Sequence, residues 1–476
     1  MPISSESMIR ASLIEAKYKA DEERKDEAQK KLDLFKDDYE DIIRTKIAEL
    51  FHKDNYDRLR FHVNQSQNIL KRVIKEISTL YRNPPSRTLS SDNKRYSEIV
   101  AETRIDSKML KVNRYTNLLN ECLVKVGFRG GRIVYDILTP NIVTVLQNDD
   151  DPTIADAIMY ETNYVNSAGK ASKLYHVWDV WGNAYDMDEH FRIVREIWIG
   201  DSPYKGREGQ FVIPITTFHR EEPDDAFFDQ DTGRDLYNAA VLIGVKMTLF
   251  DYYFKTASFK QPYLIGDEVT APAEQVADPM TIFRARGENA QIGVLDFQIN
   301  LDQLQNALVY QINSVINNYG ISADAWTLSI AEMSGRALRI RNRALTEARE
   351  EQIPVYADAE GDLFEKTRIV NNVHFPSRKI SESASFKIDY AEMDIPDDPE
   401  EERDVWKAKL QDGLITLGQF YQHFNPDVKD EQEAEERLIE NLVKLKELRA
   451  EHSDIEDMLN AILSKPKPIQ PGGGEE

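Results

Sequence analysis

The segment AAVLIGVKMTLFDYYF, at residues 239–254, constrains the fold more than any other stretch of the chain. Its apolar side chains cover nearly the whole circumference of a helix predicted for residues 233–259, so that helix must be buried on almost all sides. The run is interrupted by charges and is shorter than the roughly 20 residues that a membrane span needs. We expect a central core helix, or one packed between subunits, with a single wet face that carries Lys246, Asp251 and Lys255.

The length and charge of the chain limit its function classes. With 476 residues, 41% of them hydrophobic, it exceeds what one hydrophobic core usually serves and can build two or three packed units. Its 83 acidic and 60 basic residues give a formal charge of −23. This charge argues against tight wrapping of nucleic acid, because phosphate neutralisation needs a basic footprint. An acidic surface favours solubility and repels DNA.

Cysteine content and the two ends of the chain suggest a protein that stays in a reducing interior. Cys122 is the single cysteine, which excludes an intrachain disulfide, and its place after Leu118 and Leu119 favours a buried thiol over a nucleophile. The N-terminal residues lack a basic region followed by an apolar run, so no secretory signal is expected. Residues 464–476, rich in proline and glycine, are expected to be disordered.

Hydrophobic periodicity predicts an α+β chain that is mainly α-helical. Spacings of three and four residues predict a helix over residues 41–83, ended by Pro84, and a second helix that passes Leu123 and stops near Gly127. From residue 128 to residue 218 the period changes to two, and the segments are rich in β-branched and aromatic residues. This part is expected to form an antiparallel β region.

Further periodic segments lie in the second half of the chain. Residues 260–299 are broken by proline and glycine but carry short strand signals, which predict a small module, and residues 301–318 predict a helix. In the last third, one helix ends at Gly413 and a short one is capped by Thr416. A long helix follows Pro426, with acidic residues first and basic residues last, as the helix dipole favours.

The segment AEMSGRALRIRNRAL, at residues 331–345, joins a loop to a basic helix. Ser334 is a favoured N-cap and Gly335 permits close backbone approach, so the loop is expected to end here. Charged side chains then recur at three- and four-residue spacings. These are Arg336, Arg339, Arg343 and Glu347. They either pair this helix with a neighbouring segment or subunit, or form salt bridges on an exposed face.

No group of residues has the spacing of a catalytic or cofactor site. The sequence has no phosphate-binding glycine loop, no histidine pair at metal spacing, no serine elbow and no second cysteine, so we expect neither enzymatic activity nor a cofactor. Three carboxylates, Asp149, Asp150 and Asp151, crowd one turn, but they lack the ligand spacing of a calcium loop. A solvated hairpin is the favoured interpretation, and no metal is assigned.

Four segments, taken in order, carry a family resemblance. They are NILKRVIKEISTLYRNPPSR, the stretch from IPITTFH to DYYFK, MSGRALRIRNRAL, and DGLITLGQFYQHF with the Glu-rich helix after it. They resemble the helix-and-proline entry, the strand, linker and stem helix, the Ser-Gly-x-Ala-Leu helix and the crown of portal proteins of tailed bacteriophages, of the SPP1-type siphophage group. Thr416 stands where a serine is more usual. The resemblance covers most of the chain.

The resemblance implies a portal fold with an antiparallel β-rich wing, a helical stem, a small α/β clip and a helical crown. The implied divisions are an N-terminal helical part of the wing (1–127), the β-rich wing (128–234), a stem helix (235–259), the clip (260–299), a second stem helix (300–318), the tunnel loop (319–333), a long helix with the return to the wing (334–397), the crown (398–463) and a disordered tail (464–476).

The resemblance also implies a role in viral DNA packaging. A portal is a dodecameric ring at one capsid vertex of the virion, assembled in the host cytoplasm. Terminase drives double-stranded DNA through its channel without sequence specificity, and DNA ejection later uses the same path. The implied partners are further copies of the chain, the major capsid and scaffold proteins, the terminase large subunit and the head-tail adaptor at the head-tail connector, with no membrane.

On this resemblance, two segments would face the DNA. The tunnel loop carries Ser322, Asp324, Trp326, Thr327 and Glu332, and the channel face of the stem carries Lys246, Asp251 and Lys255. A channel for DNA of any sequence should bind phosphates weakly, because tight Lys or Arg contacts would hold the duplex in place. Acidic walls with a few lysines agree with that requirement.

Two function classes other than a portal remain open. An acidic helical scaffold or adaptor of a virion suits the charge but does not explain the broken loop ahead of the Arg-rich helix. A metal-dependent nucleic-acid enzyme could use the many carboxylates but lacks a spaced ligand set. Nuclease activity with metal would favour the enzyme, and a monomer or an open fibre would favour the scaffold.

Overall fold

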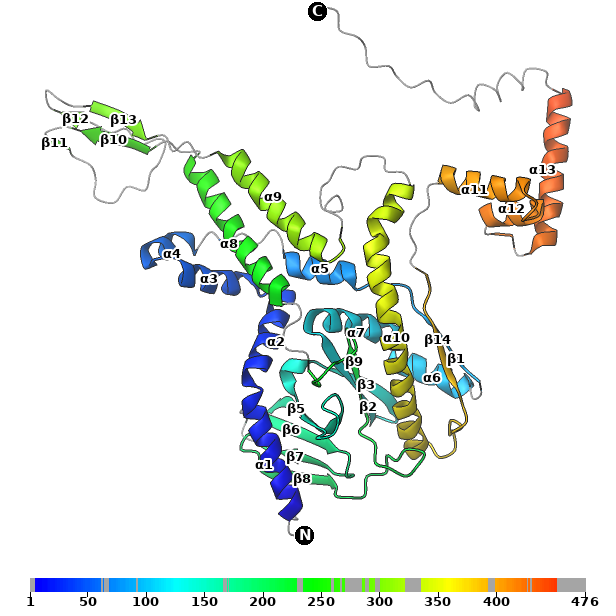
Figure 1. The fold of residues 1–476 in the computed structure, drawn as a ribbon, viewed down its shortest axis with the longest axis horizontal. Helices are drawn as coiled ribbons and strands as arrows, with labels where there is room; N and C mark the ends of the chain where they lie inside the picture. Colours follow the sequence, from blue (N-terminus) through cyan, green and yellow to red (C-terminus); the bar gives the residue numbers. More distant parts are fainter. Residues whose placement is uncertain are drawn as a thin grey trace, which may run out of the picture. The chain divides into compact units, whose positions relative to one another are not determined.

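The computed structural model shows an α+β chain, mainly helical, that divides into two compact units (Figure 1). The first unit comprises Met1–Ile330 and Arg341–Asp394, and the second comprises Ala331–Ile340 and Ile395–Glu476. No helix in the described residues is long and apolar enough to cross a membrane. The structure describes residues 5–60, 63, 68–90, 93–165, 169, 171–228, 234–257, 261–265, 268–269, 285–286, 291–295, 300–321, 335–392, 399–425, 427–428 and 430–451.

The N-terminal part of the first unit is a series of helices. They are α1 (Ser5–Ala20), α2 (Glu22–Phe35), α3 (Tyr39–Leu50), α4 (Lys53–Leu59), α5 (Ile69–Ile77), α6 (Asn93–Thr103) and α7 (Ile105–Leu119). The single helix predicted over residues 41–83 is therefore wrong. The chain is extended at Phe51, and Asn68 starts α5 as a new N-cap, its side chain accepting a hydrogen bond from the Lys71 amide. Capping side chains offer the backbone an alternative to a continuous helix.

The prediction that the next helix passes Leu123 and ends near Gly127 is also wrong. Helix α7 ends at Leu119, and Asn120 takes a positive φ of 72°. Asparagine tolerates this region better than most residues, so it ends the helix without a glycine. Strand β2 (Glu121–Arg129) follows at once and contains both Leu123 and Gly127. Cys122 on β2 is fully buried, which confirms the predicted buried thiol, and burial raises the pKa of that thiol.

Two antiparallel sheets form the predicted β region. The first has the order β3-β2-β9, from β3 (Arg132–Leu138) and β9 (Ile215–His219) on either side of β2. The second is a meander of consecutive neighbours β4 (Val143–Gln147), β5 (Ala155–Val165), β6 (Ala171–Asp179), β7 (Ala184–Met187) and β8 (Ile193–Trp198). A 3-10 turn, η1 (Pro140–Ile142), joins β3 to β4. The prediction of antiparallel strands is confirmed, although the short strand β7 gave no clear alternation in the sequence.

The hairpin at Asp149, Asp150 and Asp151 connects β4 to β5 and is held by its own side chains. Asn148 Oδ1 accepts hydrogen bonds from the amides of Asp150 and Asp151 at 2.9 and 3.0 Å. The Asp151 carboxylate accepts from the hydroxyl and the amide of Thr153, and these bonds lower the pKa of Asp151. Within the described residues no three His, Cys, Asp or Glu side chains are grouped as a metal site.

Three hydrophobic clusters hold the first unit together. The largest packs the β3-β2-β9 sheet against α6, α7 and α10 (Gly335–His374), and its members include Ile99, Val112, Phe218 and Val370. A second joins α2, α3, α5 and α7 to α8 (Arg234–Ala257) and α9 (Leu301–Asn318). In the third, α1 packs on the face of the meander. The strand β14 (Phe386–Asp389) pairs with β1 (Ser86–Leu89) and so returns the chain to its N-terminal half.

Helix α8 confirms the predicted helix but not its burial on almost all sides. Five apolar side chains lie in the second cluster, Leu236, Ala240, Val241, Ile243 and Val245. Leu242, Tyr253 and Phe254 are instead 41%, 37% and 57% exposed. One chain alone therefore leaves part of this apolar helix in contact with water.

Gly244 allows α8 to approach α3 closely. A Cβ atom at this position would lie 2.6 Å from Ile43 Cδ1 and closer still to the hydroxyl of Tyr39. Both neighbours are buried, and burial raises the pKa of Tyr39 to about 12. The close atoms are the ends of these two packed side chains, so an added Cβ atom would force the side chains to shift within the core.

Gly244→Ala is expected to lower the free energy of unfolding by about 1–3 kcal/mol, because overpacking outweighs the better helix propensity of alanine. Gly361→Ala on α10 is the matched control, since no atom lies within 4 Å of the position of its Cβ. The control should be neutral or stabilising by up to about 1 kcal/mol. Urea unfolding monitored by circular dichroism measures both. Equal stabilisation by the two substitutions would contradict the close approach.

The small module predicted between α8 and α9 contains strands. Strand β10 (Gln261–Ile265) pairs with β13 (Gln291–Leu295), and β11 (Glu268–Val269) pairs with β12 (Ala285–Arg286). Of this segment the structure describes strands only, so the helical part of the predicted α/β clip has no counterpart among the described residues. The strand predictions are confirmed, while the assignment as a clip stays a prediction.

The second unit confirms the helices predicted for the last third of the chain. They are α11 (Pro399–Gln411), α12 (Leu417–Phe424) and α13 (Glu431–Glu451). Gly413 has a positive φ of 71° just past α11. Thr416 caps α12 in a reciprocal capping box, in which its hydroxyl accepts from the Gln419 amide and the Gln419 side chain accepts from the Thr416 amide, both at 3.1 Å.

Candidate functional site

The structure describes only part of the predicted site. All five tunnel-loop residues, Ser322, Asp324, Trp326, Thr327 and Glu332, lie outside the described residues. The side chains of Arg336, Arg339 and Lys255 do so as well. The described residues show the surface of the α8 and α9 pair and the contacts that attach α10.

Helices α8 and α9 lie side by side and are tied by hydrogen bonds at the middle of the pair and at one end (Figure 1). Lys246 Nζ on α8 donates to Gln311 Oε1 on α9 at 2.7 Å, and the Tyr319 hydroxyl after α9 donates to Asp235 Oδ1 at 2.8 Å. Asn300 caps α9 by accepting from the Gln303 amide, which agrees with the predicted start of this helix. The pair is therefore one structural element, bound to the unit through the second cluster.

Apolar side chains remain exposed on this pair. Leu242, Tyr253 and Phe254 on α8 are joined by three residues on α9, Leu304, Val309 and Tyr310, which are 39%, 38% and 75% exposed. We call these six residues the exposed apolar surface of the helix pair. Single exposed apolar residues are ordinary, but six on two adjoining helices, spread over more than one side of the pair, favour neighbouring chains that pack on the pair.

The predicted wet face of α8 does not form a single face. Lys246 and Asp251 are five positions apart, which separates them by about 140° around a helix. Lys246 is exposed and turned toward α9 through its bond to Gln311. The two charges cannot line one narrow channel wall together, and their role toward DNA stays a prediction.

Arg343 and Glu347 form the predicted pair on α10. Arg343 Nε donates to Glu347 Oε1 at 2.7 Å, and the side chains are 78% and 55% exposed. Such an exposed pair is screened by solvent and adds little stability. In the single subunit it is a surface salt bridge, and pairing with another subunit stays a prediction.

A buried charge pair attaches α10 to β1 and α7. The sequence pattern alone did not identify this pair. Arg87 on β1 binds Glu360 on α10 with two parallel hydrogen bonds of 2.8 and 2.6 Å, and their side chains are 4% and 1% exposed. Arg87 also donates to Asp106 on α7 at 2.6 Å, and the Tyr81 hydroxyl donates to Glu360 at 2.9 Å. Burial alone would lower the pKa of Arg87, but its bonds to Glu360 raise it, so the arginine stays charged.

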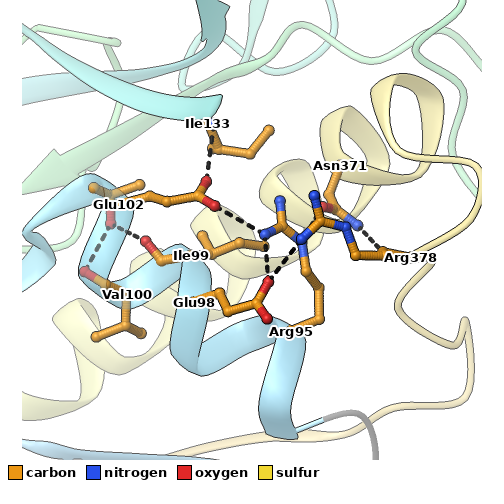
Figure 2. A network of polar contacts seen from close by, with 9 residues as sticks. Arg95, Glu98, Ile99, Val100, Glu102, Ile133, Asn371 and Arg378 are labelled. Atoms are coloured by element: carbon orange, nitrogen blue, oxygen red, sulfur yellow. Dashed lines mark hydrogen bonds and ion pairs between the residues drawn. The ribbon is translucent and has the colours of Figure 1, made fainter. Parts of the chain in front are cut away.

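A second polar network attaches the C-terminal part of α10 (Figure 2). Arg95 on α6 donates to Asn371 on α10 at 2.9 Å and to the carboxylates of Glu98 and Glu102 at 3.0 and 2.9 Å. Arg378, just past α10, donates to Glu98 at 3.1 Å, so Glu98 lies between two arginines in Figure 2. These bonds hold α10 to α6.

Helix α10 is a long helix within the division predicted at residues 334–397. It runs to His374 and includes Pro354, which normally interrupts a helix because it lacks an amide proton. Past the proline, Tyr356, Leu363 and Phe364 are buried in the largest cluster. Their burial, with the two charge networks, offsets the missing hydrogen bond and lets the helix continue.

A groove of about 640 Å³ lies alongside α10, between this helix and β9. It is lined by apolar residues from the β4 to β5 turn and by His219, Asp358, Asp362 and Lys366. Lys366 Nζ bonds the Ile215 carbonyl and the Asp362 carboxylate, so its charge is used within the fold. Burial lowers the pKa of His219 to about 4, which makes this histidine neutral at pH 7.

The low pKa of His219 predicts a pH dependence of stability. Because the unfolded chain takes up a proton near pH 6.5 and the folded chain only near pH 4, the neutral histidine's contribution is present above 6.5 and is lost as pH falls toward 4. Relative to His219→Gln, the wild-type free energy of unfolding should fall by up to about 3 kcal/mol across this window. Urea titrations at several pH values measure the difference. Parallel profiles of both proteins would contradict it.

Comparison with known proteins gives a weak structural likeness. No family model and no curated protein matches the chain. A chain in the neck of an empty gene transfer agent particle, computed with C6 symmetry, has 11% identity and a TM-score of 0.45 over 76% of this chain and 90% of its own length. A chain of the native gene transfer agent virion has 10% identity and a TM-score of 0.43, with 77% and 92% covered. A chain in the neck of the native gene transfer agent particle, computed with C12 symmetry, has 11% identity and a TM-score of 0.45. The match covers 78% of this chain and 93% of that chain. Identities and scores this low assign the chain to no family.

Proposed function

We propose that the chain is a virion structural protein, the subunit of a portal ring at one vertex of a tailed-phage capsid. Terminase would package DNA through the channel of this ring, and DNA would later leave through it toward the head-tail connector. The observation that carries the proposal is the exposed apolar surface on α8 and α9, on the segments that resemble the portal stem.

This surface supports a ring because a lone subunit leaves it in water. Burying apolar area stabilises association by about 25 cal/mol per Å² before the costs of ordering are subtracted. A head-to-tail contact between copies closes into a ring when the rotation allows it. Each copy would then cover the helix pair of its neighbour, and α8 would be buried on almost all sides in the assembly, as predicted.

The charge of the chain supports a channel that does not bind DNA tightly. With a formal charge of −23, copies arranged in a ring would present a field that repels phosphates. DNA would pass by shape and not by salt-sensitive binding to lysine or arginine. An acidic scaffold shares this charge, and oligomeric form separates the two proposals.

Negative-stain images and mass photometry of the purified chain test the proposal. We expect closed rings with a central hole. Only monomers at micromolar protein and moderate salt, with no rings after addition of capsid protein, would overturn it. Open fibres would favour the scaffold, and metal-dependent nuclease activity would favour an enzyme.

The tunnel-loop prediction has its own test. Deletion of residues 322–327 is expected to leave ring formation intact and to impair DNA packaging or retention, because a loop that rides over a moving duplex contributes to transport and not to assembly. Packaged-DNA yield in a complementation assay and ring images measure the two effects. An unchanged yield, or collapse of the ring, would place the channel elsewhere.

A further inference from the structure

An aromatic cavity in the first unit has no part in the proposed channel. It encloses about 320 Å³ between β2, β3, β6 and β8 and the end of α10. Trp178 and Tyr204 are only 9% and 4% exposed and form its inner wall, while Phe128 and Ile197 are each 39% exposed and lie at its mouth. We propose that this cavity binds a small molecule made of one planar ring system that bears an anionic group.

The inner wall suits a flat ring. Trp178 and Tyr204 stack with their ring centroids 6.0 Å apart and an interplanar angle of 18°. Trp198 meets both rings at an angle, with centroid distances of 5.5 and 5.4 Å. Aromatic walls favour planar ligands through stacked and edge-to-face contacts. The volume lies near the lower end for ligand pockets, about 300–1,000 Å³, and so suits a single ring system.

One partly buried cation, Lys125, gives the cavity its charge. Lys125 Nζ lies 5.6 Å from the Trp178 ring centroid and 4.9 Å from that of Tyr160, and it donates to the Tyr160 hydroxyl. In the described part of the chain no carboxylate forms an ion pair with this ammonium, and Asp136 and Asp186 act on it only from further away; burial lowers the pKa of Lys125, and these two carboxylates partly offset that effect. An ammonium has three donors, so hydrogen-bonding capacity remains. A partly buried charge without a direct ion pair is costly, and an anion from outside would reduce that cost.

The other polar groups at the cavity add no net charge. Arg129 at the mouth binds Asp136 with two hydrogen bonds of 2.6 and 2.8 Å, so this pair adds no net charge. His374 stacks on Phe128 with centroids 4.2 Å apart and shares a 2.9 Å hydrogen bond with the Tyr204 hydroxyl. Burial lowers the pKa of His374, which leaves it neutral at pH 7. Lys125 therefore supplies the net positive charge, which calls for an anionic ligand.

Two common sources offer this chemistry, an aromatic carboxylate and a nucleoside monophosphate. Calorimetric titration of the full chain with benzoate and with adenosine monophosphate distinguishes them. Benzyl alcohol, adenosine and inorganic phosphate each carry only half of the required chemistry. We expect at least one ring-bearing anion to bind with a Kd of about 1 mM or tighter, and each half-probe to bind at least about tenfold more weakly.

Two variants and one control locate the binding. Lys125→Met nearly keeps the length of the side chain and removes its charge. It should weaken binding of the ring-bearing anion at least about tenfold, so that the anion binds no more tightly than its neutral analogue. Ile197→Trp fills the mouth from the solvent side and should block every probe, which preserves the test if Lys125→Met does not fold. Lys205→Met removes a lysine that lies over the Phe211 ring outside the cavity, and binding should not change.

Three results would overturn the proposal. They are the absence of binding by both ring-bearing anions at millimolar concentration, binding of inorganic phosphate as tight as that of adenosine monophosphate, and unchanged binding in a folded Ile197→Trp protein. The inference does not depend on ring formation, because a subunit that never assembles still contains the cavity.

Discussion

Glu360→Ala is expected to lower the free energy of unfolding by about 3–5 kcal/mol, more than any other single change discussed for this chain. The substitution removes the carboxylate that pairs with Arg87, while the guanidinium stays 4% exposed and, among the described residues, keeps Asp106 near the surface as its one ion-pair partner. It also removes one acceptor of the Tyr81 hydroxyl, which keeps its 3.1 Å hydrogen bond with the Tyr390 hydroxyl. Chemical unfolding monitored by tryptophan fluorescence and circular dichroism measures the loss.

A double variant separates the unpaired charge from lost packing. In Arg87→Met with Glu360→Leu, both charges leave together, and most of the stability should return because buried ion pairs are often replaced by apolar residues at little cost. Glu360→Gln keeps the shape and should fall between the wild type and Glu360→Ala. If the double variant were as unstable as Glu360→Ala, lost packing around α10, and not the stranded charge, would explain the effect.

The second large effect is expected at Tyr310, the most exposed of the six residues of the exposed apolar surface. Under the proposed function this side chain is buried between subunits, so Tyr310→Glu places an unpaired charge at each contact and should convert rings into monomers. The isolated subunit should unfold within about 0.5 kcal/mol of the wild type, because the side chain is 75% exposed there. Mass photometry at increasing protein concentration measures the oligomer.

Tyr310→Phe is the matched control for the ring experiment. It keeps the aromatic ring and removes only the hydroxyl, so it should assemble as the wild type does. Closed rings from Tyr310→Glu would show that this face of α9 is not an interface. Loss of rings from both variants would indicate a role of the hydroxyl instead of apolar burial.

Local patterns predicted much of the fold and some of its boundaries. The spacing of apolar residues placed α9 at residues 301–318, and Thr416 and Gly413 marked ends of helices that the structure confirms. Alternation predicted most strands of the meander. These features depend on residues within about four positions of one another, through side-chain periodicity and capping hydrogen bonds, so they can be read from a short window.

The candidate site was less predictable than the fold. The periodicity of α8 showed that its surface is apolar but not which side chains the subunit itself covers, and Leu242 and Tyr253 proved exposed. The Lys246 and Asp251 pair was assigned to one face from its charge, although helix geometry separates the two. The lysine and aromatic residues around the cavity lie on strands that are distant in sequence, and no motif joins them.

The sequence alone determined the helix and strand content, the buried cysteine and the acidic charge, because each depends on composition or on local free energies. Tertiary structure alone decided where α7 ends, how far α10 continues past Pro354, and which charges are buried. Arg87 and Glu360 are 273 positions apart, and Lys125 meets Tyr160 only because two sheets pack together. Burial and pairing at such separations depend on the free energy of the whole packed unit, which no local pattern contains.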